Sequence, residues 1–192
     1  MTIFLILAPY GAFTFLMLLA PAVVAVFAAS LIALGVIALD AMHGRTLKLF
    51  GAGGAIVFAG IGLYLAFVDP ALATSKVKLA VDTGILIVSA GSMLIRFPFT
   101  LQYALEAVPA ETAAMPGFLR ANYMITGAWA AASLLVMLSN LALLYVPGLP
   151  IWTSLLIAFA ARNSALYFTK WYPQYRERKY GASPASALPS AH

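Results

Sequence analysis

The sequence predicts an all-α membrane protein, a polytopic helical bundle of five or six transmembrane helices. Hydrophobic residues make up 64% of its 192 residues and charged residues only 9%, whereas about a quarter of the residues in soluble proteins are charged. The mean hydropathy is +0.97. A soluble chain of this length could not bury so many apolar side chains, because its surface needs polar cover. We therefore expect one integral-membrane domain over residues 1–180.

The remaining segment, residues 181–192, is rich in Ala, Ser and Pro. This composition predicts a disordered tail, because it offers little apolar surface to bury.

The first uncharged run, from Ile3 to Leu39, is longer than the roughly 20 residues that one spanning helix needs. Pro21 divides it into a short or tilted first helix, Pro9 to Leu19, and a full crossing, Ala22 to Leu39. Whether the first helix crosses the bilayer decides between six and five spans.

Four further apolar segments follow, each bounded by charged residues or by Pro-Gly turns. The expected spans are Leu49 to Phe67, Leu79 to Ile95, Tyr123 to Tyr145 and Ile151 to Phe168. Between Arg96 and Asn122 lies the longest polar connection, in which three prolines punctuate mixed apolar and polar residues. This pattern predicts one or two amphipathic turns on the membrane surface.

The span that begins at Leu49 is rich in glycine. Helices in lipid associate by close packing rather than by hydrophobic exclusion, so small residues mark contact faces. We expect helix packing at Gly51, Gly53, Gly54 and Gly60, with Gly62 on the same span.

Two ionisable residues lie inside expected spans. Asp82 lies about one turn inside its span, where an acid is costly and often marks an ion path or an internal ion pair. Lys78, one turn earlier, can neutralise it locally, and we favour this structural pairing over a pathway role. Arg162 lies about ten residues into the last span and can reach Asp82, in a contact that is structural or that lines a substrate crevice. Interhelical hydrogen bonds are expected from Asn122, Asn140 and Asn163.

Successive connections between the spans alternate between many and few Lys and Arg residues. One side of the membrane receives eight of them, namely Arg45, Lys48, Arg96, Arg120, Lys170, Arg176, Arg178 and Lys179. The other side receives Lys76 and Lys78. By the positive-inside rule the eight lie in the cytoplasm, which predicts a cytoplasmic C-terminus. We expect the lipid interface to be contacted by Arg96, Lys170, Trp171, Arg176, Arg178 and Lys179.

The residues that carry chemistry are sparse. Cys is absent and the two histidines are His43 and His192, too few for a haem or metal site. No His or Lys base lies at suggestive spacing from Ser92, Ser133 or Ser139. The net charge of +5 is scattered, unlike a basic nucleic-acid-binding surface. We therefore expect no enzyme activity, catalytic residue, cofactor, metal or nucleic acid. The expected partners are the lipid bilayer and other integral membrane proteins, and homo-oligomerisation stays open.

Several short motifs occur in a recognisable order. They are Asp69-Pro70, Lys76-Val77-Lys78, Arg96-Phe97-Pro98-Phe99-Thr100, Asn122-Tyr123 and Trp129-Ala130, followed by the aromatic and basic terminus. In these features the chain resembles the bacterial intracellular septation protein A family over about Pro9 to Tyr180. The resemblance implies a non-enzymatic, multi-pass protein of the bacterial inner membrane, linked to cell division and envelope synthesis and acting through contacts with other membrane proteins.

Two alternatives to that function remain. The chain can be an accessory subunit of a larger energy-converting membrane complex, or a small transporter that uses Asp82 and Arg162.

Overall fold

The computed structural model describes residues 3–180, and all regular structure within this range is helical. The helices, in chain order, are α1 (Ile3–Leu16), α2 (Ala22–Met42), α3 (Leu49–Phe67), α4 (Thr74–Leu94), α5 (Phe99–Ala107), α6 (Ala110–Ala113), α7 (Phe118–Tyr145) and α8 (Ile151–Tyr180). The all-α fold expected from the sequence is confirmed. The tail expected over residues 181–192 lies outside the described residues.

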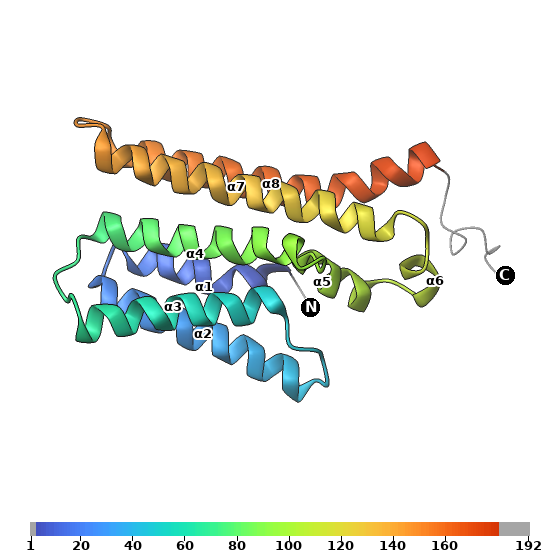
Figure 1. Cartoon of the computed structure of the whole chain (residues 1–192), viewed down its shortest axis with the longest axis horizontal. Helices are drawn as coiled ribbons and strands as arrows, with labels where there is room; N and C mark the ends of the chain where they lie inside the picture. The colour runs from blue at the N-terminus through green and yellow to red at the C-terminus, as the bar shows by residue number, and fades with distance from the viewer. Residues whose placement is uncertain (1–2, 181–192) are drawn as a thin grey trace.

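The long helices form a layered bundle (Figure 1). The antiparallel pair α7 and α8 forms one layer, α4 packs against both α7 and α3, and α2 packs between α3 and α1. The α2–α3 loop, α5, α6 and the C-terminal end of α8 lie at one end of the bundle. We call this the α5 end, and the opposite end, with the α3–α4 and α7–α8 turns, the far end.

Four of the described helices, α2, α3, α4 and α7, are long and apolar enough to cross a membrane. Arg162 and Asn163 interrupt the apolar half of α8, which is not among the four. α8 packs along α7 in an antiparallel pair. At 14 residues, α1 is shorter than the roughly 20 residues that a crossing needs.

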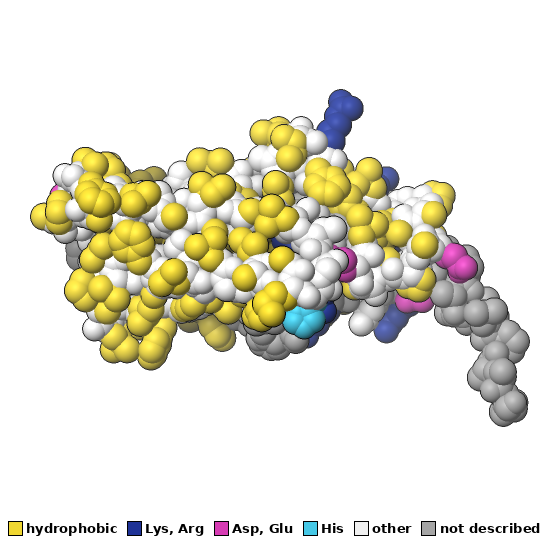
Figure 2. Space-filling model, turned by 90° about the horizontal axis from the view of Figure 1, so that it is seen from below, with side chains coloured by type: hydrophobic (Ala, Val, Ile, Leu, Met, Phe, Trp, Pro, Cys, Tyr) yellow, Lys and Arg dark blue, Asp and Glu magenta, His cyan; other side chains and the backbone are white. Residues whose placement is uncertain are grey.

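The surface has the character expected of a protein surrounded by lipid. Large apolar side chains are exposed on several helices, for example Leu31 at 69%, Ile56 at 72% and Phe159 at 69%. The face drawn in Figure 2 is hydrophobic over most of its length, and its charged side chains lie mainly towards the α5 end. A soluble monomer rarely exposes apolar patches of this extent. The chain is therefore a multi-pass membrane protein.

Five helices extend beyond their expected bounds, including α1, which runs from Ile3 to Leu16 rather than from Pro9 to Leu19, and α2, which ends at Met42 rather than Leu39. α4 begins at Thr74 rather than Leu79, α7 begins at Phe118 rather than Tyr123, and α8 continues to Tyr180 rather than ending at Phe168. Hydropathy locates the part of a helix that lies in lipid. The backbone hydrogen bonds continue into the interface, where residues such as Lys and Arg are good helix formers.

Two glycines interlock α3 with α4. A Cβ atom at Gly53 would lie 2.7 Å from Val88 Cγ1, and a Cβ atom at Gly84 would lie 2.5 Å from Val57 Cγ1. Each glycine thus receives a valine from the opposite helix, one turn away from the other contact. Only glycine allows this close approach of the two backbones.

The other glycines of α3 differ in their surroundings. Gly54 lies against the Tyr10 hydroxyl of α1, and a Cβ atom at Gly62 would lie 3.0 Å from the Phe27 ring of α2. Gly51 has only ordinary van der Waals neighbours. The expected packing role of Gly60 is wrong, because this residue is exposed and a Cβ atom there would meet nothing within 4 Å.

Candidate functional site

An ion pair joins α4 to α8 inside the bundle. Arg162 Nη2 lies 3.8 Å from Asp82 Oδ1, and the two side chains are 32% and 9% exposed, respectively. The second carboxylate oxygen of Asp82 accepts a hydrogen bond from Asn140 Nδ2 of α7. Three helices therefore meet at one carboxylate. The partner in the ion pair is Arg162, whereas Lys78 forms no ion pair with Asp82 among the described residues.

The hydrogen bonds continue from this carboxylate towards the far end. Ser154 Oγ donates to Asn140 Oδ1 over 3.1 Å. The four residues lie at increasing depth, counted from the end of each helix that lies at the far end of the bundle. The count is three residues for Ser154, five for Asn140, eight for Asp82 and eleven for Arg162. At 1.5 Å per residue these counts correspond to depths of about 5, 8, 12 and 17 Å. We call these four residues the polar string. It runs from the far end to the middle of the bundle.

A small cavity of about 30 Å³ lies where the polar string ends. Asp82 and Arg162 contribute polar atoms to its wall, together with Tyr10 of α1 and Ser133 of α7. A cavity of this volume with several polar partners is large enough for one water molecule. The ion pair thus lines a small, mostly apolar space inside the bundle.

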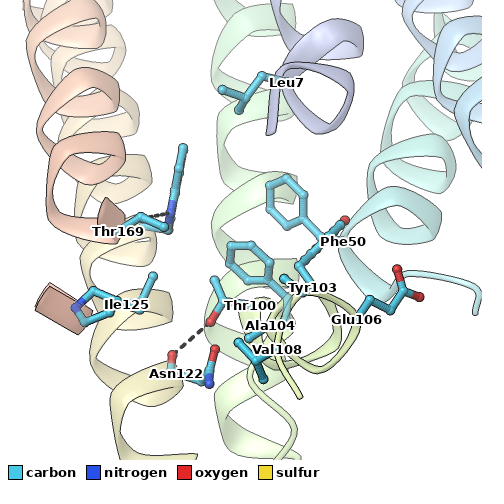
Figure 3. A pocket seen from close by; sticks show the side chains of 14 residues that line it. Leu7, Phe50, Thr100, Tyr103, Ala104, Glu106, Val108, Asn122, Ile125 and Thr169 are labelled. Carbon is cyan, nitrogen blue, oxygen red and sulfur yellow. Dashed lines mark hydrogen bonds between the residues drawn. The ribbon is translucent and has the colours of Figure 1, made fainter. Parts of the chain in front are cut away.

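A large cavity of about 350 Å³ lies nearer the α5 end. α5 supplies one side of its wall through Thr100, Tyr103, Ala104 and neighbouring residues, and α7 faces them from the other side (Figure 3). Most of the lining side chains are apolar, with a few polar groups among them. This combination is typical of sites for small organic ligands.

Leu7, Phe50 and Trp129 line both cavities and form the partition between them. Trp129 Nε1 donates to Thr169 Oγ1 over 3.0 Å, which fixes the indole ring against α8. The Phe50 ring stacks on Phe99, with 4.4 Å between the ring centroids. The partition is therefore made of side chains that are held from both α8 and α5.

Polar contacts attach α5 to the loop between α2 and α3. Lys48 Nζ donates to Glu106 Oε1 over 2.6 Å, and the hydroxyl of Thr46 donates to the same oxygen over 3.1 Å. Gln102 Oε1 accepts from the backbone N–H of Leu49 over 2.6 Å, at the start of α3. We call Lys48, Gln102 and Glu106 the α5 clamp. It holds α5 against the large cavity.

The clamp also sets the protonation of its members. The hydrogen bond from Lys48 lowers the pKa of Glu106, and the contact with Thr46 adds to this. Burial raises the pKa of Tyr103 well above its usual range, and the negative charges of Asp40 and Glu106 act in the same direction. At neutral pH Glu106 is therefore charged, and Tyr103 presents a neutral hydroxyl.

The remaining polar residues singled out from the sequence lie apart from the ion pair. Asn122 is buried and lines the large cavity, but its side chain donates to the Phe118 carbonyl of its own helix over 3.0 Å. Its interhelical bond is made by its backbone carbonyl, which accepts from Thr100 of α5 over 3.0 Å. Asn163 is exposed and donates to Phe159 within α8. The expected interhelical bond from the Asn163 side chain is therefore wrong.

Most residues of the expected lipid-interface belt lie at the α5 end. Arg96, Lys170, Trp171, Arg178 and Lys179 are exposed there, and Trp171 stacks on Tyr175 with 5.0 Å between ring centroids. Arg176 differs, because its guanidinium donates to the Gly117 carbonyl that precedes α7. This contact ties the two helices together, so Arg176 has a protein partner and is only half exposed.

Sequence reasoning missed several residues of the site. Ser154 and Tyr10 belong to it, although neither carries a charge that marks it among the many polar residues of the spans. Lys48 counts among the basic residues of the cytoplasmic side in the sequence analysis, yet its side chain is 5% exposed and paired with Glu106. The one signal available was the spacing of Gln102 and Glu106, which places both on one face of an amphipathic helix.

Comparisons with family models, curated proteins and solved structures gave no match. Within residues 3–180 no three His, Asp or Glu side chains gather as a metal site would require. The site is therefore interpreted from its own geometry.

Proposed function

We propose that the chain is a small carrier of the bacterial inner membrane, with Asp82 and Arg162 as its charged centre. The observation that supports this function is that the ion pair lines an internal cavity that adjoins a ligand-sized one. Ionisable residues within a membrane are costly, and those facing an internal cavity often mark substrate or ion paths.

The arrangement of the polar groups suggests how such a carrier works. A ligand enters the large cavity from the α5 end and displaces the partition of Leu7, Phe50 and Trp129 to reach the ion pair. Protonation of Asp82, or a ligand group that binds Arg162, breaks the attraction between α4 and α8. The α7–α8 pair is then free to move relative to the other helices, as alternating access requires.

Orientation is part of this proposal. Arg45, Lys48, Arg96, Arg120 and the basic residues that end α8 all lie on segments at the α5 end, whereas Lys76 lies towards the far end. From the positive-inside bias we propose that the α5 end, and with it the C-terminus, faces the cytoplasm.

Loss of proton-coupled flux in an Asp82→Asn variant tests the proposed function. Everted membrane vesicles would be energised, and the response of a ΔpH-sensitive dye to a panel of small amphiphiles would be recorded. A carrier of this type gives compound-dependent ΔpH changes that Asp82→Asn removes while the variant is inserted and folded normally. Equal responses in vesicles with and without the protein would contradict the proposal.

A second candidate is the non-enzymatic septation and envelope role that the sequence resemblance implies. The observation in its favour is that no buried polar side-chain atom among the described residues lacks a hydrogen-bond partner. A cluster satisfied in this way can serve structure alone, leaving function to contacts with other membrane proteins. Deletion would then change cell length, and a division protein would co-purify in mild detergent. Co-purification with an energy-converting complex would instead support the accessory-subunit alternative.

A further inference from the structure

The wall of the large cavity is apolar over most of its extent. Phe50 and Phe99 are held by their mutual stacking, Trp129 by its hydrogen bond to Thr169, and Ile125 by burial. These side chains are fixed in place, so the space of about 350 Å³ is already formed. Preformed apolar pockets of about 300–1,000 Å³ are typical of small-molecule sites. The body of a ligand here must be apolar.

The polar groups of the wall favour a ligand that donates a hydrogen bond. Asn122 uses its amide N–H on its own helix, which leaves the amide oxygen as the atom to meet a ligand. The carbonyl of Thr169 lacks its usual helical donor, because residue 173, four positions later, is a proline without an N–H. Both residues line the cavity. Two acceptors are thus present on the side formed by α7 and α8.

The opposite side of the cavity offers a neutral hydroxyl. Tyr103 of α5 lines the wall, and burial and the nearby negative charges keep it protonated by raising its pKa. A phenolic hydroxyl both donates and accepts hydrogen bonds. The polar end of a ligand therefore meets acceptors from α7 and α8 and a donor from α5.

The cavity wall has no unmatched charge. Glu106 is the one ionisable acid among the lining residues, and its carboxylate is paired with Lys48 at 2.6 Å. A cationic head group would have to compete with Lys48 for Glu106, and an anionic head group would be repelled by Glu106. The charge balance favours an uncharged head group.

We propose that the large cavity binds a single-chain amphiphile, an apolar chain that ends in an uncharged hydroxyl group. This assignment rests on the proposed function, for which it names the ligand class, but its binding test does not require transport. Trp129 lies in the wall and serves as a built-in reporter, whereas Trp152 and Trp171 are 63% and 40% exposed.

The test uses contact quenching of Trp129 by bromine. Both other tryptophans are replaced, as Trp152→Phe and Trp171→Phe, and the full chain is reconstituted in phosphatidylcholine and phosphatidylglycerol vesicles. The probe is a medium-chain ω-bromoalkan-1-ol. Saturable quenching is expected, and the matching bromoalkane without a hydroxyl should bind about fivefold more weakly, as the loss of one hydrogen bond implies. The ω-bromoalkanoate should also bind more weakly.

Cavity-filling variants show whether the quenching arises in this cavity. Ala104→Phe places a ring inside the cavity, and Ala107→Phe does so at its exposed rim, where misfolding is a smaller risk. The matched control is Ala131→Phe, at an exposed position of α7 outside the cavity wall. Saturable quenching should persist in Ala131→Phe and disappear in the other two. Quenching that rises linearly with probe concentration and is equal in all three would overturn the assignment.

Asp82→Asn separates this assignment from the proposed function. Asp82 does not line the large cavity, so the variant should still show saturable quenching by the bromoalkanol even where it abolishes flux. Binding without any flux in the unmodified chain would leave the ligand site standing and reject the carrier. Flux without saturable quenching would reject the ligand class and keep the carrier.

Discussion

Arg162 of α8 reaches towards the far end to meet Asp82 of α4, and 3.8 Å separates Nη2 from Oδ1. The carboxylate is nearly buried, whereas about a third of the arginine side chain is exposed. Losing the ion-pair partner therefore has a different energetic cost for Asp82 than for Arg162. The long Arg162 side chain can reorient, whereas Asp82 is held between α4, α7 and α8.

This asymmetry predicts unequal effects of removing each partner. Arg162→Gln leaves a buried carboxylate with only Asn140 and should destabilise the protein by about 3 kcal/mol. Asp82→Asn leaves a partly exposed cation and should cost less. The double variant Asp82→Asn, Arg162→Gln should be more stable than Arg162→Gln alone. Thermal unfolding in detergent micelles measures all three. A double variant less stable than Arg162→Gln would show that the pair is not coupled as described.

The glycine interlock between α3 and α4 predicts a position-specific effect of added volume. Gly84→Val places a branched side chain against Val57, where a single Cβ would already be 2.5 Å away. We expect a loss of about 1–3 kcal/mol from overpacking. Gly60→Val is the matched control on the same helix pair, because its surroundings are empty. Equal loss in both variants, measured by unfolding, would mean that the close contact between Gly84 and Val57 is not responsible.

The residue that follows α4 predicts a stabilising substitution. Arg96 has a φ of 61°, in the left-handed region that favours glycine, and the N–H of Phe97 bonds to the Ser92 carbonyl over 3.0 Å. Arg96→Gly and Arg96→Ala remove the same charge, but only glycine relieves the backbone strain. The glycine variant should be about 1 kcal/mol more stable than the alanine variant. Melting temperatures of the pair provide the comparison, and an alanine variant at least as stable would refute the strain.

The α5 clamp predicts a pH dependence of α5. The pKa of Glu106 in the folded protein lies below the ordinary value of 4.5. Its contribution is therefore complete above that ordinary pKa and is lost as the pH falls through the lower, folded pKa. The protection of the α5 amides, which is their hydrogen exchange measured relative to the intrinsic rate at each pH, should fall in this acidic range. Glu106→Gln should lower this protection at neutral pH as well, while Glu111→Gln on α6 should not. Full protection in Glu106→Gln at neutral pH would contradict the role of the clamp.

The proposed orientation predicts which ends are open to each side of the membrane. The chain has no native cysteine, so single cysteines report cleanly. His43→Cys lies at the α5 end and Val146→Cys at the far end, and both positions are exposed. A membrane-impermeant maleimide added to intact cells should label Val146→Cys alone, and everted vesicles should reverse the result. Labelling of both positions from the same side would contradict the topology.

The fold was predictable because it depends on composition and on the length of apolar runs. Segments such as Ala22 to Leu39 are too apolar for water and long enough to span, so an all-α bundle follows directly. The ends of the helices were less predictable. Hydropathy does not show where the helical backbone hydrogen bonds end. For this reason α8 extends twelve residues past its expected end at Phe168.

The site was predictable only where charge marked it. Asp82 and Arg162 stand out in the sequence, since an ionised group inside lipid needs a partner. The partner of Asp82 depends on how the helices are rotated about their axes. This rotation brings Arg162 to Asp82, although Lys78 is nearer in the sequence. Ser154 and Tyr10 give no such signal. The large cavity arises from the packing of α5 across α7, a long-range relationship that no local pattern encodes.

Helix length has one further consequence. α7 has 28 residues and α8 has 30, so they measure about 42 and 45 Å at 1.5 Å per residue, against a hydrocarbon thickness of about 30 Å. The hairpin turn at Pro147 keeps them level with the other helices at the far end. The excess length therefore stands clear of the lipid on one side only. There the two helices extend past the expected hydrocarbon thickness and are joined by the bond from the Arg176 guanidinium to the Gly117 carbonyl.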